Sequence, residues 1–361
     1  MIARAAFGRH TSGRAVDAIT LENSRGVRVR FLTYGGVLHS LELPDRAGTR
    51  DDVTLGFDRL EEYYGSPFYF GAIIGRNANR IARGRLLVDG RAYSLTINNP
   101  PNHLHGGALG LHQALWEADT FERGGERGAV LTATSAAGDD GYPGTVSVRV
   151  TYTLSDANEF RIAYEATTDA PTPVNLTQHA YFNLSGAAGS DVRDHLLCIE
   201  ADAFTPVDDS LIPTGEFRPV DGTPFDFRAP HAIGRDLGSN DAQLALGQGY
   251  DHNWVLNGGN PGSSSRDRDA HLRRAATLMH PPTGRSLQLL TTEPGLQVYA
   301  GGTFTTGLAG KRGVVYPRYG GIALETQAFP DAPNQPSFPS TILRPGERYE
   351  STTVWRFGVM P

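Results

Sequence analysis

Apolar and polar residues alternate with a period of two along much of this chain, and this pattern constrains its fold more than any other feature. The alternation is clearest at residues 27–31, 146–154, 160–165 and 349–357. Successive side chains of a β-strand point to opposite faces, so each segment predicts a strand with one face on a core. Helical periodicity is almost absent, and only Asp58–Tyr64 predicts a short helical turn. The chain is therefore expected to be all-β.

The turns and connections indicate how these strands are arranged. The sequence holds 43 glycines and 23 prolines without a repeat period, which is typical of many short strands joined by turns. Asp89–Gly90, between two apolar stretches, predicts a hairpin. Because strands follow one another without a linker, we expect one large antiparallel β-sandwich over residues 1–361, with a barrel as the alternative. Gly258–Asp269, rich in Gly, Ser, Asp and Arg, predicts a flexible loop inside this single domain.

Composition disfavours several classes of partner. The formal net charge of −6 and the lack of a basic run argue against nucleic acid. Cys198 is the only cysteine, which rules out an intrachain disulfide and a Cys-rich metal site, and its apolar surroundings predict a core position. The first ten residues lack the apolar stretch of a signal peptide, and no segment approaches the ~20 apolar residues of a membrane helix. We therefore expect a cytoplasmic location and no membrane partner.

Five segments carry polar side chains that a plain β-sandwich does not need. They are Gly75–Ile81, Asn102–Gly107, Val174–Leu184, Tyr250–Trp254 and Gly321–Gln327. In the third of them, a single strand is expected to carry Asn175, Thr177, His179 and Tyr181 on one face. In the last, the same parity places Glu325 on a face with the small Ala323 and the polar Gln327.

Each of these residues has a structural explanation when it is taken alone. His179 could be a hydrogen-bonded strand histidine, and Glu325 a solvated carboxylate on an edge strand. Asp251 could form an Asx-turn and Arg80 a surface ion pair of little energetic consequence. A further alternative is a metal site made of three histidines, His103, His105 and His252. No carboxylate accompanies them at ligand spacing, so no metal is predicted.

Taken together, the motifs resemble those of the aldose 1-epimerase (galactose mutarotase) family. Gly-Arg-x-x-Asn-Arg-Ile, Leu-His-Gly-Gly, Asn-Leu-Thr-x-His-x-Tyr-Phe-Asn-Leu, Tyr-Asp-His-Asn and Leu-Glu-Thr-Gln-x-x-Pro-Asp-Ala occur here in the family's order, beginning at residues 75, 104, 175, 250 and 324. Further similarity lies at residues 34–36 and 55–57. The resemblance thus covers nearly the whole chain.

The resemblance implies a large antiparallel β-sandwich with its sugar site in an open cleft. It implies that Glu325 is the general base and His179 the general acid. It also assigns the sugar contacts to Arg80, His105 and Asp251, supported by Asn79 and Gln297. The implied substrate is a free hexose such as galactose or glucose, the implied reaction needs no cofactor, and the protein is expected to be a monomer or a homodimer.

Other functions remain open at this point. A glycoside hydrolase would use Asp251 and Glu325 as its carboxylate pair, but it would not need a histidine acid. A non-catalytic sugar-binding domain would have lost the chemistry, whereas both Glu325 and His179 are present. An epimerase acting on hexose 6-phosphates would require a basic phosphate clamp, which the sequence does not reveal.

Overall fold

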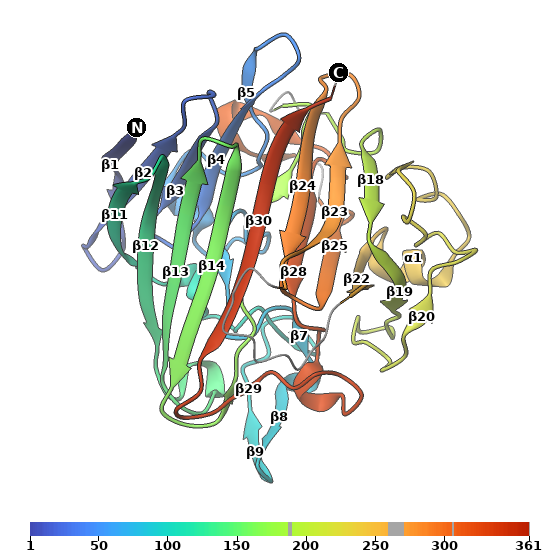
Figure 1. Ribbon diagram of the computed structural model, residues 1–361. Coiled ribbons are helices and arrows are strands. Elements are labelled where there is room, and N and C mark those ends of the chain that lie inside the picture. The colour runs from blue at the N-terminus through green and yellow to red at the C-terminus, as the bar shows by residue number, and fades with distance from the viewer. Residues whose placement is uncertain (187–189, 259–270, 305–306, 361) are drawn as a thin grey trace.

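Two layers of β-sheet make up most of the protein in the computed structural model, which describes residues 1–186, 190–258, 271–304 and 307–360 (Figure 1). One layer is a nine-stranded sheet, which lies at the front in Figure 1. Its strands, in spatial order, are β11 (Glu117–Arg123), β12 (Glu126–Ser135), β13 (Val146–Ser155), β14 (Glu159–Thr168), β30 (Tyr349–Val359), β24 (Arg285–Thr291), β23 (Arg273–Met279), β18 (Leu196–Ile199) and β21 (His231–Ala232). Neighbouring strands of this sheet are antiparallel.

The second layer consists of two antiparallel sheets behind the first. A five-stranded sheet holds β1 (Ile2–Arg9), β2 (Ala15–Glu22), β3 (Arg28–Leu32), β4 (Leu38–Pro44) and β5 (Arg50–Asp52). A six-stranded sheet holds β17 (Tyr181–Phe182), β28 (Ile322–Gln327), β25 (Gly295–Tyr299), β22 (Asp251–Leu256), β19 (Ala201–Thr205) and β20 (Arg218–Pro219).

One apolar core joins the three sheets. It contains Val29 of the five-stranded sheet, Tyr152 and Trp355 of the nine-stranded sheet, and Trp254 and Leu296 of the six-stranded sheet, all of them buried. The longer strands, such as β13 and β14, contribute every second residue to this core, because alternate side chains point to the same face. The removal of these apolar side chains from water is the main force that holds the two layers together. The expected all-β antiparallel sandwich is confirmed.

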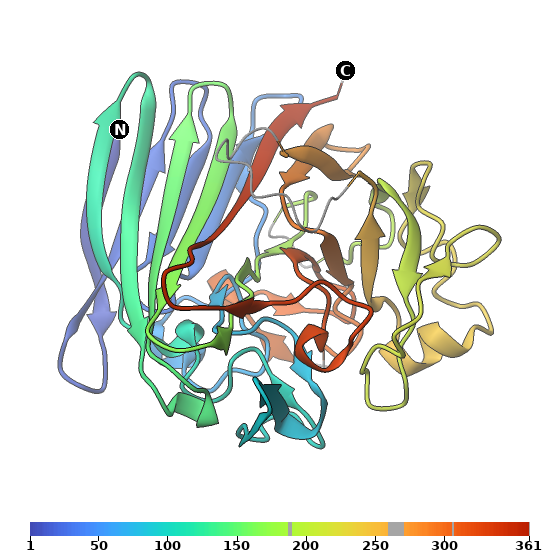
Figure 2. The same ribbon diagram turned by 60° about the horizontal axis from the view of Figure 1, so that its bottom comes forward.

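Short pairs of strands and single turns connect the main sheets. The strand pairs are β6 (Ile73–Ile74) with β16 (Thr177–Gln178), β7 (Arg80–Ile81) with β10 (His103–Leu104), β8 (Arg85–Val88) with β9 (Arg91–Ser94), β15 (Thr172–Pro173) with β29 (Ile342–Leu343), and β26 (Leu308–Ala309) with β27 (Val315–Tyr316). Figure 2 looks onto the edge of the sandwich from which β8 and β9 project. Within the described residues the only α-helix is α1 (Ala242–Gly247), and the 3₁₀ turns are η1 (Leu60–Tyr63), η2 (Ala82–Gly84), η3 (Leu111–Gln113), η4 (Asp139–Gly141), η5 (Lys311–Gly313) and η6 (Ala332–Asn334).

Several local predictions are confirmed. The four alternating segments form β3, β13, β14 and β30, and the predicted helical turn at residues 58–64 contains η1. The hairpin at residues 85–94 turns at Asp89 and Gly90, whose φ angles are 50° and 78°. Positive φ at both central residues is what a tight hairpin turn matched to the twist of its strands requires.

Two local predictions are wrong, and a third falls largely outside the described residues. Val174–Leu184 does not form one strand, because β16 pairs with β6 whereas β17 pairs with β28, with His179 in the gap between them. Cys198 is only half-buried, because its neighbours Leu197 and Ile199 occupy the core-facing side of β18. The predicted loop Gly258–Asp269 lies outside the described residues from position 259 onward. None of the described helices is long and apolar enough to cross a membrane.

Burial of histidines makes the stability of this fold dependent on pH. Burial disfavours the imidazolium and lowers the pKa of His39 to about 3, and it lowers the pKa to about 4 at His112, His179, His195 and His252. Unfolding exposes these rings, so below their ordinary pKa the unfolded chain binds protons that the folded chain does not. Their stabilising contribution is complete above the ordinary pKa of 6.5. It is lost as the pH falls toward 4, by up to ~1.4 kcal/mol per pH unit for each group.

We therefore expect the free energy of unfolding in urea to decrease steeply as the pH is lowered from 6.5 to about 4. The carboxyls of Glu293, Glu325 and Asp331 act in the opposite direction because burial raises their pKa values, but they are fewer than the histidines. The substitution His195→Asn should make this pH dependence shallower by one proton. An unfolding midpoint that is the same at pH 7 and pH 5 would contradict this prediction.

Candidate active site

A cleft of about 740 Å³ opens on the face of the six-stranded sheet that points away from the core. Alternation within β28 gives the sheet one core face and one cleft face, since Leu324 points into the core and Glu325 lines the cleft. The same holds in β25, where Tyr299 lines the cleft and its neighbour Val298 is a core residue. Further walls come from segments at residues 67–69, 79–80, 99–105 and 209–211 and from the end of α1 at residues 246–248.

Antiparallel register brings the polar residues of three strands together. Gln297 of β25 lies directly opposite Glu325 of β28, and Asp251 of β22 lies opposite Tyr299 of β25. The side-chain amide of Gln297 donates a hydrogen bond of 2.6 Å to Oδ1 of Asp251. Asp251 lines the cleft, whereas Gln297 lies behind it and is 3% exposed. Gln297 thus contacts the carboxylate of Asp251 rather than the open space of the cleft.

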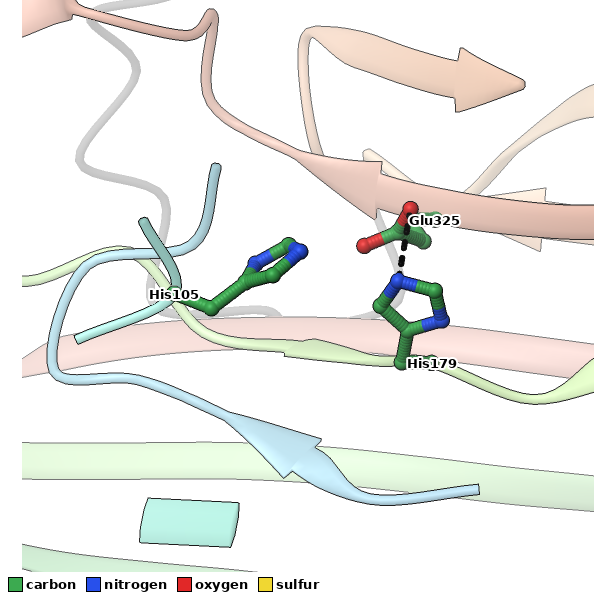
Figure 3. A group of neighbouring side chains, drawn as sticks. All are labelled: His105, His179 and Glu325. Atoms are coloured by element: carbon green, nitrogen blue, oxygen red, sulfur yellow. Dashed lines mark ion pairs between the residues drawn. The ribbon is translucent and has the colours of Figure 1, made fainter. Parts of the chain in front are cut away.

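His179 and Glu325 face each other across the gap between two chain segments. Tyr181 of β17 pairs with Ala323 of β28 in the antiparallel sense. His179 lies two residues before Tyr181 and Glu325 two residues after Ala323, so the two come to the same side of this pair. Nε2 of His179 is 3.6 Å from Oε1 of Glu325, and the two side chains point toward one another in Figure 3. Glu325 is only 2% exposed and belongs to a strand that is paired on both sides. The alternative that Glu325 is a solvated edge-strand carboxylate is therefore wrong.

His105 approaches the same pair from the Leu-His-Gly-Gly segment, and its ring centre lies 5.1 Å from that of His179 (Figure 3). The backbone N–H of Asn79 donates to Nδ1 of His105 at 3.1 Å. A neutral imidazole that accepts at Nδ1 carries its hydrogen on Nε2, so His105 offers a donor on that side of its ring. The backbone of this segment passes so close to Gly75 that a Cβ atom on Gly106 would lie 2.0 Å from the carbonyl oxygen of Gly75.

Arg80 is held at the edge of the cleft by three different segments. Its Nε donates to Oδ1 of Asn99 at 3.3 Å, and its Nη2 lies 3.5 Å from Oδ2 of Asp251. Its carbonyl oxygen accepts a 2.9 Å hydrogen bond from the N–H of Asp331, which belongs to the Pro-Asp-Ala end of the last motif. Asn79 orients the same residue, since its Oδ1 accepts from the N–H of Arg80 at 2.8 Å. Arg80 is buried, so it is not a surface ion-pair residue. The carboxylate oxygens of Asp251 contact Arg80 and Gln297 rather than the backbone of an Asx-turn.

Burial dominates the electrostatics of the pair. It raises the pKa of Glu325 well above its ordinary value, and the negative charge of Asp251 adds to this effect while Arg80 opposes it. Burial also lowers the pKa of His179 to about 4. Burial thus disfavours the charged form of both groups, the carboxylate of Glu325 and the imidazolium of His179. Burial likewise lowers the pKa of His105 well below its ordinary value, so this ring is neutral.

Two polar atoms of the pair have no hydrogen-bond partner among the residues that the structure describes. Oε2 of Glu325 and Nδ1 of His179 are buried and make no hydrogen bond to the part of the chain that the structure describes. A buried polar atom without a partner costs about 1–3 kcal/mol. Unpaired atoms of this kind beside a cleft indicate a polar ligand that satisfies them.

A metal ion is a poor match for this site. His105, His179 and Glu325 offer ligand atoms within 4.8 Å of one another. However, Nδ1 of His105 accepts the hydrogen bond from Asn79, so a metal on Nε2 would require an imidazole without any proton. Nor do His103, His105 and His252 form a metal-binding group among the described residues. His103 bonds instead to the hydroxyl of Tyr142 and the carbonyl of Thr96.

The cleft also contains residues that sequence reasoning did not find. They include Tyr69, Asn99, Ser210, Gln248, Tyr299 and Thr303. Tyr299 could have been found, since it lies two residues after Gln297 and strand alternation places both on one face. The others lie outside the strands of the main sheets, and no motif or periodicity marks them.

Comparison with known proteins agrees with this geometry. The family model for aldose 1-epimerase matches residues 17–356. Galactose mutarotase from Homo sapiens is 44% identical over 359 residues, with 99% of each chain covered. Aldose 1-epimerase from Escherichia coli is 37% identical over 347 residues, with 96% of each chain covered.

Solved structures give the same answer. The crystal structure of galactose 1-epimerase from Lactobacillus acidophilus superposes with a TM-score of 0.85 at 30% identity, covering 100% of this chain and 99% of that one. An aldose epimerase homologue from C. elegans superposes with a TM-score of 0.83 at 33% identity, covering 95% and 98% of the two chains. Sequence, fold and family model thus agree over nearly the whole length, and the chain belongs to the aldose 1-epimerase family, whose members are isomerases.

Proposed function

We propose that this enzyme interconverts the α and β anomers of free hexoses such as galactose and glucose, with Glu325 as general base and His179 as general acid. The observation that carries the proposal is the buried contact of 3.6 Å between the carboxyl and the imidazole at the cleft. Opening of a pyranose removes a proton from the C1 hydroxyl and adds one to the ring oxygen. A base and an acid that act together avoid both a free alkoxide and a free oxocarbenium ion, and each contributes about 10²–10⁴-fold to the rate.

The proposed mechanism gives the pair one shared proton, whose location changes when sugar binds. In the free protein, burial favours a protonated Glu325 and a neutral His179. Sugar hydroxyls that donate to Glu325 stabilise its carboxylate, and a ring oxygen that accepts from His179 stabilises the imidazolium. Binding therefore moves the proton toward His179, which prepares the pair for ring opening.

The open aldehyde then turns about its C1–C2 bond and closes on the other face. Ring opening leaves Glu325 protonated and His179 neutral, and closure uses the two groups in reversed roles. Meanwhile the forked donors of Arg80, the acceptor Asp251 and the Nε2–H of His105 hold the other hydroxyls of the sugar. Asn79 and Gln297 act through these residues, because one orients His105 and Arg80 and the other bonds Asp251.

Polarimetry tests the proposal directly. Freshly dissolved α-glucose and α-galactose should lose optical rotation faster with the protein than without it, in proportion to protein concentration. Equal rates with and without folded protein would overturn the proposal. Release of reducing sugar from a methyl galactoside would favour a glycoside hydrolase instead, although the engagement of Asp251 with Arg80 and Gln297 argues against a nucleophilic role.

Arg80 is expected to act mainly by positioning the sugar. Arg80→Lys keeps the charge but loses the fork of donors, so the contacts to Asn99 and Asp251 cannot both be made. A misplacement of about 1 Å costs on the order of 10²-fold in rate, so we expect KM to rise and kcat to fall.

Steady-state kinetics on both sugars will also locate the contact. Glucose and galactose differ only at C4, so equal losses would place Arg80 at hydroxyls that the two sugars share. A loss confined to one sugar would place it at the C4 hydroxyl. Unchanged kinetics on both would show that Arg80 does not bind the substrate.

A cytoplasmic enzyme that acts without a metal, as a monomer or a homodimer, completes the proposal. The tautomer of His105 supports catalysis without a metal, since it leaves a hydrogen-bond donor where a metal would need a lone pair. Gel filtration and activity after dialysis against a chelator test these two points.

A further inference from the structure

We infer that Tyr69 is a positioning residue for this reaction, which holds the imidazoles of His179 and His105 in their working orientation. The inference rests on the proposed function, because it gives Tyr69 a role only through those histidines. Tyr69 lines the cleft with a φ of 52°, in the left-handed region that bulky side chains rarely adopt. Glycine or asparagine would be the favoured residue at such a position, so an aromatic ring there needs a reason.

The backbone after Tyr69 is bonded directly to His179. The N–H of Ala72 donates to the carbonyl of Tyr69 at 3.0 Å and closes a tight turn. The N–H of Gly71 donates to the carbonyl of His179, and the N–H of His179 donates to the carbonyl of Ala72, both at 2.9 Å. The turn thus fixes the main chain of His179 on both sides of its Cα atom, in the gap between β16 and β17.

The turn is also pressed against the sandwich. Gly71 has a φ of 65°, and a Cβ atom there would lie 2.2 Å from the carbonyl oxygen of Leu38. The N–H of Leu38 donates to the carbonyl of Gly71 at 2.6 Å. Because Leu38 belongs to β4 and the core, the turn has a rigid support.

The ring of Tyr69 lies among three imidazoles. Its centre is 4.7 Å from that of His105 and 4.8 Å from that of His112, both in edge-to-face arrangements. It also stacks on His179 at 6.0 Å with 26° between the ring planes. Tyr181 stacks on His179 at 4.9 Å. Since the Nδ1 atom of His179 has no hydrogen-bond partner among the described residues, these ring contacts restrict the rotation of the imidazole.

The hydroxyl of Tyr69 extends the same role to His105. It lies beside the side chain of Asn98, which partly offsets the rise that burial causes in the pKa of Tyr69. Asn98 in turn donates to the carbonyl of Leu104 at 2.9 Å and accepts from its N–H at 2.8 Å. Leu104 precedes His105, so Tyr69 links the segment that carries His179 with the segment that carries His105.

Two substitutions separate the ring from the hydroxyl. Tyr69→Asn removes the ring but tolerates the positive φ, so the protein should fold with little change in its melting temperature. We expect kcat to fall about 10- to 100-fold in this variant, because His179 is no longer held in line with the ring oxygen. Tyr69→Phe keeps the ring, so its kcat should stay within about 3-fold of wild type while KM rises through His105.

The pH profile adds a result that a purely structural residue would not produce. Without the ring, water reaches His179, and its pKa moves from about 4 toward the ordinary 6.5. The acidic limb of the kcat/KM profile of Tyr69→Asn, which reports the free enzyme, should therefore shift to higher pH. As a control, Tyr64→Leu removes a nearby tyrosine that contacts Tyr34 and His10 instead, and it should keep the wild-type profile.

A double-mutant cycle with His179→Asn decides whether Tyr69 acts through His179. If it does, Tyr69→Asn should cost little in the His179→Asn background. Additive losses in kcat, or a folded Tyr69→Asn protein with wild-type kcat and pH profile, would overturn the inference. A His179→Asn protein with full activity would instead overturn the proposed function, and the two failures are thus distinguishable.

Discussion

Replacing Glu325 by glutamine should abolish catalysed mutarotation while sugar binding persists. The amide keeps the shape of the carboxyl and its hydrogen-bonding capacity, but it cannot take the proton of the C1 hydroxyl. Loss of a positioned base costs about 10²–10⁴-fold. Polarimetry would measure the rate, and calorimetric titration with galactose would measure binding. Because burial disfavours the charged form of Glu325, the uncharged amide should not destabilise the fold at pH 7.

Glu293→Gln is the matched control. Glu293 is also a buried acid with a raised pKa, but its Oε1 accepts from the hydroxyl of Tyr349 at 2.8 Å, and it does not line the cleft. We expect this variant to keep the wild-type kcat. A folded Glu325→Gln protein with an unchanged polarimetric rate would show that the base lies elsewhere.

His179→Asn is expected to lower kcat by about 10²-fold or more, the usual cost of losing a positioned acid. Asparagine can donate a hydrogen bond to the ring oxygen, but it cannot give up a proton. If His179 were a structural residue only, the melting temperature would fall and kcat per folded molecule would not. Both quantities have to be measured on the same preparation, with the folded fraction determined by circular dichroism.

His195→Asn provides the comparison for this substitution. His195 is fully buried, and its pKa is also about 4. Its Nε2 accepts from the N–H of Leu184 and its Nδ1 contacts Asp194, away from the residues that line the cleft. This variant should lose stability and keep its kcat. Equal behaviour of the two variants would remove the reason to assign an acid role to His179.

The sequence could predict which face of a strand a residue occupies, but not what lies opposite. Alternation alone placed Glu325 on the polar face of its strand, and this is correct. The register that sets Gln297 opposite Glu325 depends on where β25 pairs with β28, which no local pattern encodes. The prediction that Glu325 is a base therefore rests on the resemblance of motifs and not on the alternation itself.

The segment of His179 shows a second limit. Its sequence alternates like a single strand, yet its first half pairs with β6 and its second half pairs with β28. The burial of Arg80 was equally hidden, since it depends on Asp331 and Asp251, which are distant in sequence. Tyr69 carries no signal at all. Its importance follows from a turn whose partners, Leu38 and His179, are known only once the chain has folded.

The contact between His179 and Glu325 has a consequence for the whole catalytic cycle. Under the roles proposed for the two residues, the pair holds one proton before ring opening and one after ring closure, so a turnover neither takes a proton from the solvent nor releases one. No regeneration step separates successive turnovers, and the state that has just released a β anomer is the state that accepts an α anomer. Such an enzyme needs no preferred direction of reaction. It brings a mixture of anomers to equilibrium from either side, and the surrounding water serves only as the medium through which sugars arrive and leave.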